Sequence, residues 1–112
     1  MRDAGTSAHD LDALRNQAVA AWIKTYPVDD RLSAFLERVP DVWQDDISRS
    51  ARAIVRAALA SLEEAGSTGP VDITDFHGAL EQQLRRSFPW VEEPALRALR
   101  SYTGWYAWHE GY

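Results

Sequence analysis

The sequence predicts an all-α fold, a compact bundle of four to five helices around a long central helix. Three observations lead to this prediction. Apolar residues recur at intervals of three and four along most of the chain, the spacing that places them on one face of a helix. One such stretch, from Asp41 to Ala65, is unusually long. No alternation of period two persists long enough to indicate a strand.

Two predicted helices in the N-terminal half are each ended by a proline. The first is expected to start at Ser7, with Asp10 as its capping-box partner, and to stop before Pro27. Its apolar stripe consists of Leu11, Leu14, Ala18, Trp22 and Tyr26. The second covers residues 30–39, opens with acidic residues that suit the positive end of a helix dipole, and meets Pro40.

The long helix over residues 41–65 is the predicted centre of the bundle. Its apolar residues cover a broad arc, which is typical of a helix that packs on several neighbours. Gly66 follows at the position where a left-handed residue commonly ends a helix, so we expect the helix to close there.

Two further helices are predicted in the C-terminal half. Asp72 is placed to cap the fourth helix, which Pro89 ends. Pro94 lies in the first turn of the fifth, behind two glutamates. The fifth helix leads into a tail rich in aromatic residues, SYTGWYAWHEGY.

The aromatic tail raises a geometric problem. A continuous fifth helix would place Trp108 about 180° from Leu99, on the side away from the core. We therefore predict that Gly104 ends the helix and that the chain folds back across the bundle. Trp105 and Trp108 should then differ in role, one packing on the bundle and the other remaining accessible.

Length and composition set the class of protein. The 112 residues are expected to form one domain, with residues 1–6 as a flexible N-terminus and residues 7–112 as a single helical domain. The lack of cysteine excludes disulfides, thiol nucleophiles and thiolate metal sites. No apolar stretch has the length of a signal peptide core or a membrane span, so we expect a cytoplasmic protein with no membrane partner. All but one of the 12 basic residues are arginine, which favours a bacterial, GC-rich source.

Charge argues for a basic protein partner. The net charge of −5 disfavours nucleic acid, whose binding depends on cations that neutralise phosphates. Residues 29–46 carry six carboxylates against two arginines, a local balance of −4. We predict that this segment forms the electrostatic side of a partner interface and that the tail supplies aromatic anchors. The candidate partner-binding residues are Asp29, Asp30, Asp41, Asp45, Asp46, Trp105, Trp108 and Tyr112.

Other side-chain patterns point less clearly to chemistry. The stripe Arg49, Arg52 and Arg56 is explained by an ion-paired helix face, because Asp45 lies four residues before Arg49. His77 and Glu81 lie one helical turn apart, but two ligands do not make a metal site. No nucleophile and base pair is evident, so we predict no catalytic residues, no metal and no cofactor.

One segment has a local likeness to a known family. The stretch ITDFHGALEQQL, residues 73–84, resembles the first helix of barstar-type ribonuclease inhibitors, and RSYTGW, residues 100–105, is faintly similar to the stretch after that helix. The parallel strands that flank this helix in that family have no counterpart in the sequence. We carry none of the family's residues over to this chain.

The sequence is best interpreted as that of a small protein-binding module. A compact, acidic domain without catalytic residues suits stoichiometric masking of a basic toxin, so an immunity or antitoxin-like protein is the favoured hypothesis. The first alternative is a structural or regulatory helical protein that self-associates through the aromatic tail, for example as a homodimer. The second is a small helical enzyme that depends on a metal.

Overall fold

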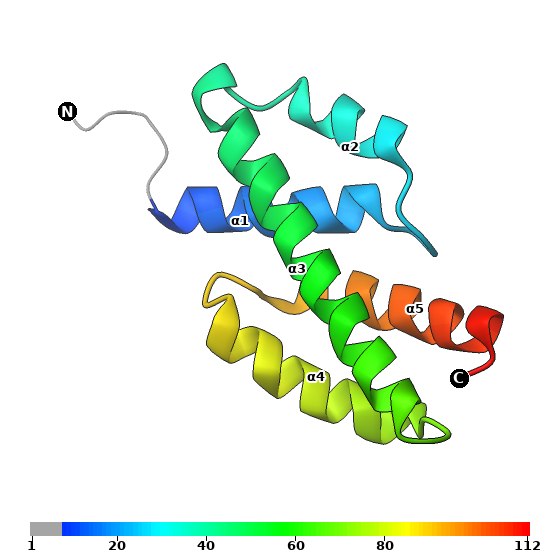
Figure 1. Cartoon of the computed structure of the whole chain (residues 1–112). Helices are drawn as coiled ribbons and strands as arrows, with labels where there is room; N and C mark the ends of the chain where they lie inside the picture. Colours follow the sequence, from blue (N-terminus) through cyan, green and yellow to red (C-terminus); the bar gives the residue numbers. More distant parts are fainter. Residues whose placement is uncertain (1–7) are drawn as a thin grey trace.

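The computed structural model describes residues 8–112 as five α-helices (Figure 1). They are α1 (Ala8–Trp22), α2 (Asp29–Leu36), α3 (Asp41–Ser67), α4 (Ile73–Ser87) and α5 (Glu93–Glu110). The predicted all-α bundle is confirmed. In this part of the chain the only β-type pairing is an isolated bridge between Ile23 and Pro27, so the parallel strands of barstar-type inhibitors are absent from it. The predicted flexible residues 1–6 and the predicted cap at Ser7 lie outside the described residues.

The long helix α3 organises the bundle, as predicted. It crosses in front of α1 and α5 in Figure 1, with α2 beside one half and α4 beside the other. α3 packs against all four other helices, whereas α4 contacts only α3 and α5. Its 27 residues span roughly 40 Å. One face of the α1–α5 pair is therefore covered by α3.

The core follows the predicted apolar stripes. α3 contributes Ile47, Ala51, Ile54, Ala58 and Leu62, each fully buried. The stripes of α4 and α5 meet them, with Leu84 and Leu99 also fully buried. Burial of these faces at about 25 cal/mol per Å² of apolar surface is the main term that holds the five helices together.

α1 ends earlier than predicted, and Tyr26 does not belong to its stripe. The chain leaves the helix after Trp22, and the N–H of Val28 donates to the Trp22 carbonyl oxygen over 3.1 Å. Tyr26 lies in this tight connection with 48% of its surface exposed. The turn has a physical cause, because Pro27 lacks an N–H and disfavours helical geometry in the residue before it.

Gly66 does not end α3, contrary to the prediction. The helix continues to Ser67, and the left-handed glycine of the α3–α4 connection is Gly69, with φ 139°. Gly66 instead permits a close contact: a Cβ at this position would lie 2.9 Å from the Tyr112 ring. The glycine is needed for space and not for backbone conformation.

Gly104 does not end α5 either. The helix runs on to Glu110 and ends at Gly111, whose φ is 80°. There the Tyr112 N–H donates to the Ala107 carbonyl oxygen over 2.8 Å, and the Gly111 N–H donates to the Trp108 carbonyl oxygen over 3.3 Å. These are the two bonds of a Schellman motif. A glycine inside a helix costs only about 1 kcal/mol. The burial of Tyr102 and Ala107 on either side of Gly104 offsets that cost.

Candidate functional site

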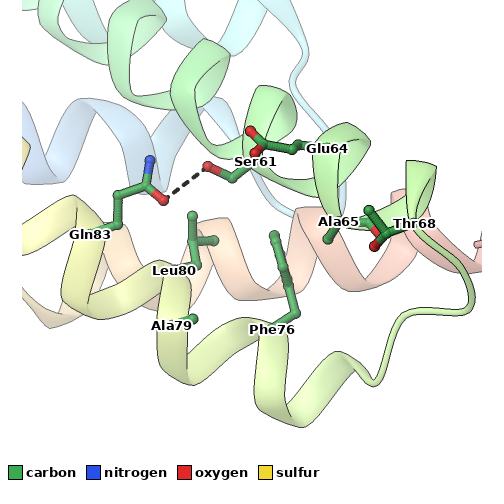
Figure 2. Close-up of a pocket in the computed structure, with 8 residues that line it drawn as sticks. All are labelled: Ser61, Glu64, Ala65, Thr68, Phe76, Ala79, Leu80 and Gln83. Carbon is green, nitrogen blue, oxygen red and sulfur yellow. Dashed lines mark hydrogen bonds between the residues drawn. The ribbon is translucent and has the colours of Figure 1, made fainter.

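A groove runs between α3 and α4 on the molecular surface (Figure 2). It has a volume of about 330 Å³, and helix α3 forms one wall and α4 the other. The eight lining residues are Ser61, Glu64, Ala65, Thr68, Phe76, Ala79, Leu80 and Gln83. Phe76 and Leu80 are buried and form an apolar floor that belongs to the core.

The groove continues towards the connection between the two helices. A second hollow shares Ala65, Thr68, Phe76 and Ala79 with the first and extends over the segment 70–75. The two hollows therefore form one continuous surface, which we call the α3–α4 groove. Ala65 and Ala79 are short side chains on opposite walls, so they leave open the space that longer residues would fill.

Charge in the α3–α4 groove is of one sign. Its lining includes the carboxylates of Glu64, Asp72 and Asp75 and no basic side chain. Asp72 caps α4, because its Oδ1 accepts hydrogen bonds from the N–H groups of Thr74 at 3.0 Å and Asp75 at 3.1 Å. The side chains of Glu64 and Asp75 are exposed and make no ion pair within residues 8–112.

One hydrogen bond crosses between the walls of the groove. The Ser61 hydroxyl on α3 donates to the Gln83 Oε1 on α4 over 3.1 Å (Figure 2). Sequence reasoning placed Asp72 and Asp75 only as helix-start residues and missed Glu64. These carboxylates lie in one groove because α3 pairs with α4. The pattern of residues along a single helix does not predict that pairing.

The predicted acidic surface is split into two groups. Asp29 and Asp30 lie at the start of α2, whereas Asp41, Asp45 and Asp46 lie at the start of α3. The C-terminal end of α2 leads into α3 (Figure 1), so the length of α2, roughly 12 Å, separates the two groups.

Most of these aspartates already have partners inside the chain. Asp46 receives a hydrogen bond from Arg15 at 3.0 Å, and Asp45 is paired with Arg49. The remaining partners are neutral: Trp22 Nε1 donates to Asp29 at 3.3 Å, and Gln44 Nε2 donates to Asp41 at 3.2 Å. Asp30 is exposed.

The aromatic tail divides as predicted, although by another route. Trp105 is half-buried in a cluster of rings, with its centroid 4.8 Å from that of His109 and 5.2 Å from that of Tyr26. Trp108 points away from the bundle and is 78% exposed. The two differ because α5 is continuous and presents them on different parts of its surface. Tyr112, 38% exposed, rests its ring on Gly66.

His77 lies in a half-buried polar contact between α4 and α5. Its Nε2 is 3.0 Å from the Thr103 hydroxyl oxygen, and that hydroxyl donates to the Leu99 carbonyl oxygen at 2.8 Å. Burial and the nearby Arg100 guanidinium lower the pKa of His77. Glu81 forms ion pairs with Arg85 and Arg100. Within the described residues, no three His, Cys, Asp or Glu side chains form a group that could hold a metal ion.

The arginine stripe of α3 is mixed in character. Arg49 makes the expected pair with Asp45. Arg52, by contrast, lies over the Trp22 ring, with its guanidinium carbon 5.2 Å from the ring centroid. This is the geometry of a cation–π contact, which ties α3 to the end of α1.

Comparison of the chain with protein-family models, with curated proteins and with solved structures returned no significant match. None of the helices in the described part of the chain is both long and apolar enough to span a membrane.

Proposed function

We propose that this protein is a protein-binding module that takes a basic segment of a partner protein into the α3–α4 groove. The observation that carries the proposal is the pairing of an apolar floor with a rim of carboxylates and no lining cation. An apolar side chain of the partner would cover Phe76 and Leu80. Lysine or arginine residues on either side of it would meet Glu64 and Asp75.

The energetics favour this arrangement over a purely electrostatic one. Exposed ion pairs contribute little each, about 0–1 kcal/mol, so carboxylates alone would steer a partner without holding it. Burial of the partner's own apolar side chain against the groove, including the more exposed Ala65 and Ala79, would supply the affinity. The net charge of −5 adds long-range attraction for a basic partner and speeds encounter.

An immunity or antitoxin-like protein is the class that we propose for this module. Such a protein would mask a basic toxin stoichiometrically, and a compact acidic domain with a docking site suits that role. The acidic groove fits that requirement. Compared with the sequence hypothesis, the proposed contact surface moves from the starts of α2 and α3 to the α3–α4 groove.

The experiment uses a fluorescently labelled, amphipathic peptide of leucine and lysine as the probe. Fluorescence anisotropy would give its Kd for the wild-type protein at low and at physiological salt. We expect Glu64→Lys and Asp75→Lys to weaken binding about tenfold each, and Ala79→Trp to abolish it by filling the groove without a change of charge. Circular dichroism would verify that the variants remain folded.

Asp30→Lys is the matched control, because it makes the same charge change at an exposed aspartate outside the groove. The proposal fails if Asp30→Lys weakens binding as much as Asp75→Lys while Ala79→Trp has no effect. That outcome would mean that the peptide responds to net charge alone.

A further inference from the structure

A second cleft lies between α1 and α5. It has a volume of about 320 Å³ and no residue of α3 or α4 lines it, so it opens on the face of the α1–α5 pair that α3 leaves uncovered. It is thus distinct from the α3–α4 groove.

The interior of this cleft is apolar and made mostly of small side chains. Ile23 and Ala98 form its floor, with 2% and 8% of their surfaces exposed. Ala20 and Pro94 line it as well. The Ser101 hydroxyl donates to the Lys24 carbonyl oxygen at 3.4 Å and so joins α5 to the segment that follows α1. Short side chains here leave room for an apolar group from outside.

The charged residues that line the cleft are both cations, Lys24 and Arg97. Lys24 is exposed and forms no ion pair in the described part of the chain. Arg97 is 77% exposed, and its Nε lies 4.0 Å from a Glu93 oxygen that Arg100 already contacts. In a chain with net charge −5, this cleft is a local site of positive charge.

Aromatic surface extends the cleft along α5. Arg97, Ser101 and Trp108 are separated by four and seven residues, which places all three within an arc of about 40° on the helix. Trp108 is 78% exposed, and no other described segment of the chain covers it. From Arg97 to Trp108 the helix rises roughly 16 Å, or three turns.

We propose that the α1–α5 cleft, with Trp108, is a second docking surface that binds an acidic, amphipathic helix of a partner protein. Apolar side chains of that helix enter the cleft and cover Trp108, while its carboxylates pair with Lys24 and Arg97. This is helix-in-groove recognition, in which anchors spaced by three or four residues follow the groove. This surface is positively charged, whereas the α3–α4 groove is negatively charged, so the two bind different ligands.

Charge also argues against a two-fold symmetric dimer of this chain through the cleft. In a two-fold symmetric dimer the same patch lies on both sides of the interface. Lys24 and Arg97 of one copy would then lie against the same two cations of the other, without a lining carboxylate to neutralise them. An acidic partner removes this repulsion.

The test uses a labelled, amphipathic peptide of leucine and glutamate as the probe, with Kd measured by fluorescence anisotropy. We expect the double variant Lys24→Glu/Arg97→Glu and the single variant Trp108→Ala each to weaken binding at least tenfold. The double variant Arg56→Glu/Arg86→Glu makes the same charge change at two exposed arginines outside the cleft; it is the matched control and should change Kd less than twofold. Binding of the basic peptide to the α3–α4 groove should be unaffected by Trp108→Ala, so the two proposals can fail separately.

A cross-link would locate the contact. Lys24 is the only lysine of the chain, so a carbodiimide should join it to a glutamate of the bound peptide. Lys24→Arg keeps the charge and removes the reactive amine, and we expect it to retain binding but lose the cross-link. The proposal is overturned if Lys24→Arg leaves the cross-link intact, or if the charge and Trp108 variants bind the peptide like wild type. A dimer in light scattering that Trp108→Ala dissociates would also overturn it, in favour of a second copy as the occupant.

Discussion

The side chain of Asn16 is bonded to the backbone of Glu92 across 76 residues of sequence. The Glu92 N–H donates to Asn16 Oδ1 at 2.7 Å, and Asn16 Nδ2 donates to the carbonyl oxygen of Trp90 at 2.7 Å. Asn16 is 2% exposed, and both bonds are partly buried. The link fastens the start of α5 to the middle of α1 and so sets how the two helices align.

Replacement of Asn16 should test this link. We expect Asn16→Ala to lower the free energy of unfolding by about 1–3 kcal/mol, because it removes these partly buried bonds to the Glu92 N–H and the Trp90 carbonyl oxygen. Chemical denaturation would measure the loss. Gln17→Ala, at an exposed neighbour on the same helix, should change stability by less than about 0.5 kcal/mol. Equal effects at both positions would show that the link adds nothing.

Gly66 and Tyr112 should be energetically coupled. In a Tyr112→Ala background, Gly66→Ala should stabilise the protein by up to about 1 kcal/mol, because alanine is the better helix former. In the wild-type background the gain should be smaller or reversed, since the new Cβ would lie 2.9 Å from the Tyr112 ring. A double-mutant cycle of unfolding free energies measures the coupling, and additive changes would contradict the contact.

The two tail tryptophans should differ in their effect on stability. Trp105→Ala should cost about 2–3 kcal/mol, because it removes a half-buried ring that packs against Tyr26, Tyr102 and His109. Trp108→Ala, at an exposed position, should change stability by less than about 0.5 kcal/mol. Thermal unfolding of the two variants side by side gives the comparison. Similar large losses would place both rings in the core.

His77 should make stability depend on pH. Its pKa in the folded state is lowered by burial and by Arg100, whereas in the unfolded chain it lies near the ordinary value of about 6.5. The stability that neutral His77 contributes is complete above that value and is lost as pH falls, because the unfolded state takes up the proton more readily. Unfolding free energies from about pH 7.5 to 5.5 should decline less steeply in His77→Gln. A slope equal to that of wild type would exclude the effect, and His109→Gln serves as the exposed control.

Asp46 and Asp30 should respond differently to loss of charge. Asp46→Asn should cost about 1 kcal/mol, since Asp46 is bound to the largely buried Arg15 and joins α3 to α1. Asp30→Asn, with the same change in charge at an exposed site, should cost less than about 0.5 kcal/mol. Denaturant midpoints would separate the two, and an equal small change would mean that the Arg15 pair is not stabilising.

The sequence by itself determined the helical class, a range of four to five helices and the central place of α3. It could do so because apolar spacing and proline breaks are local features of the sequence. The apolar spacing indicates the buried face of each helix, and the prolines indicate where helices end. The sequence also predicted that one of Trp105 and Trp108 packs and the other stays accessible, but not which one, and it derived this from a helix end at Gly104 that the structure does not contain.

Tertiary structure alone decided what the glycines do and which charges meet. Gly66 and Gly104 look like helix ends in sequence. In the structure both lie inside helices, which are stabilised by the packing of Tyr112 on Gly66 and by the burial of Ala107. Asp46 is an acidic surface residue in sequence and a partner of Arg15 in space. Both candidate surfaces arise between helices that are paired by the fold. A groove forms between two helices that pack against each other. The residue pattern along one helix does not show which helix lies opposite it.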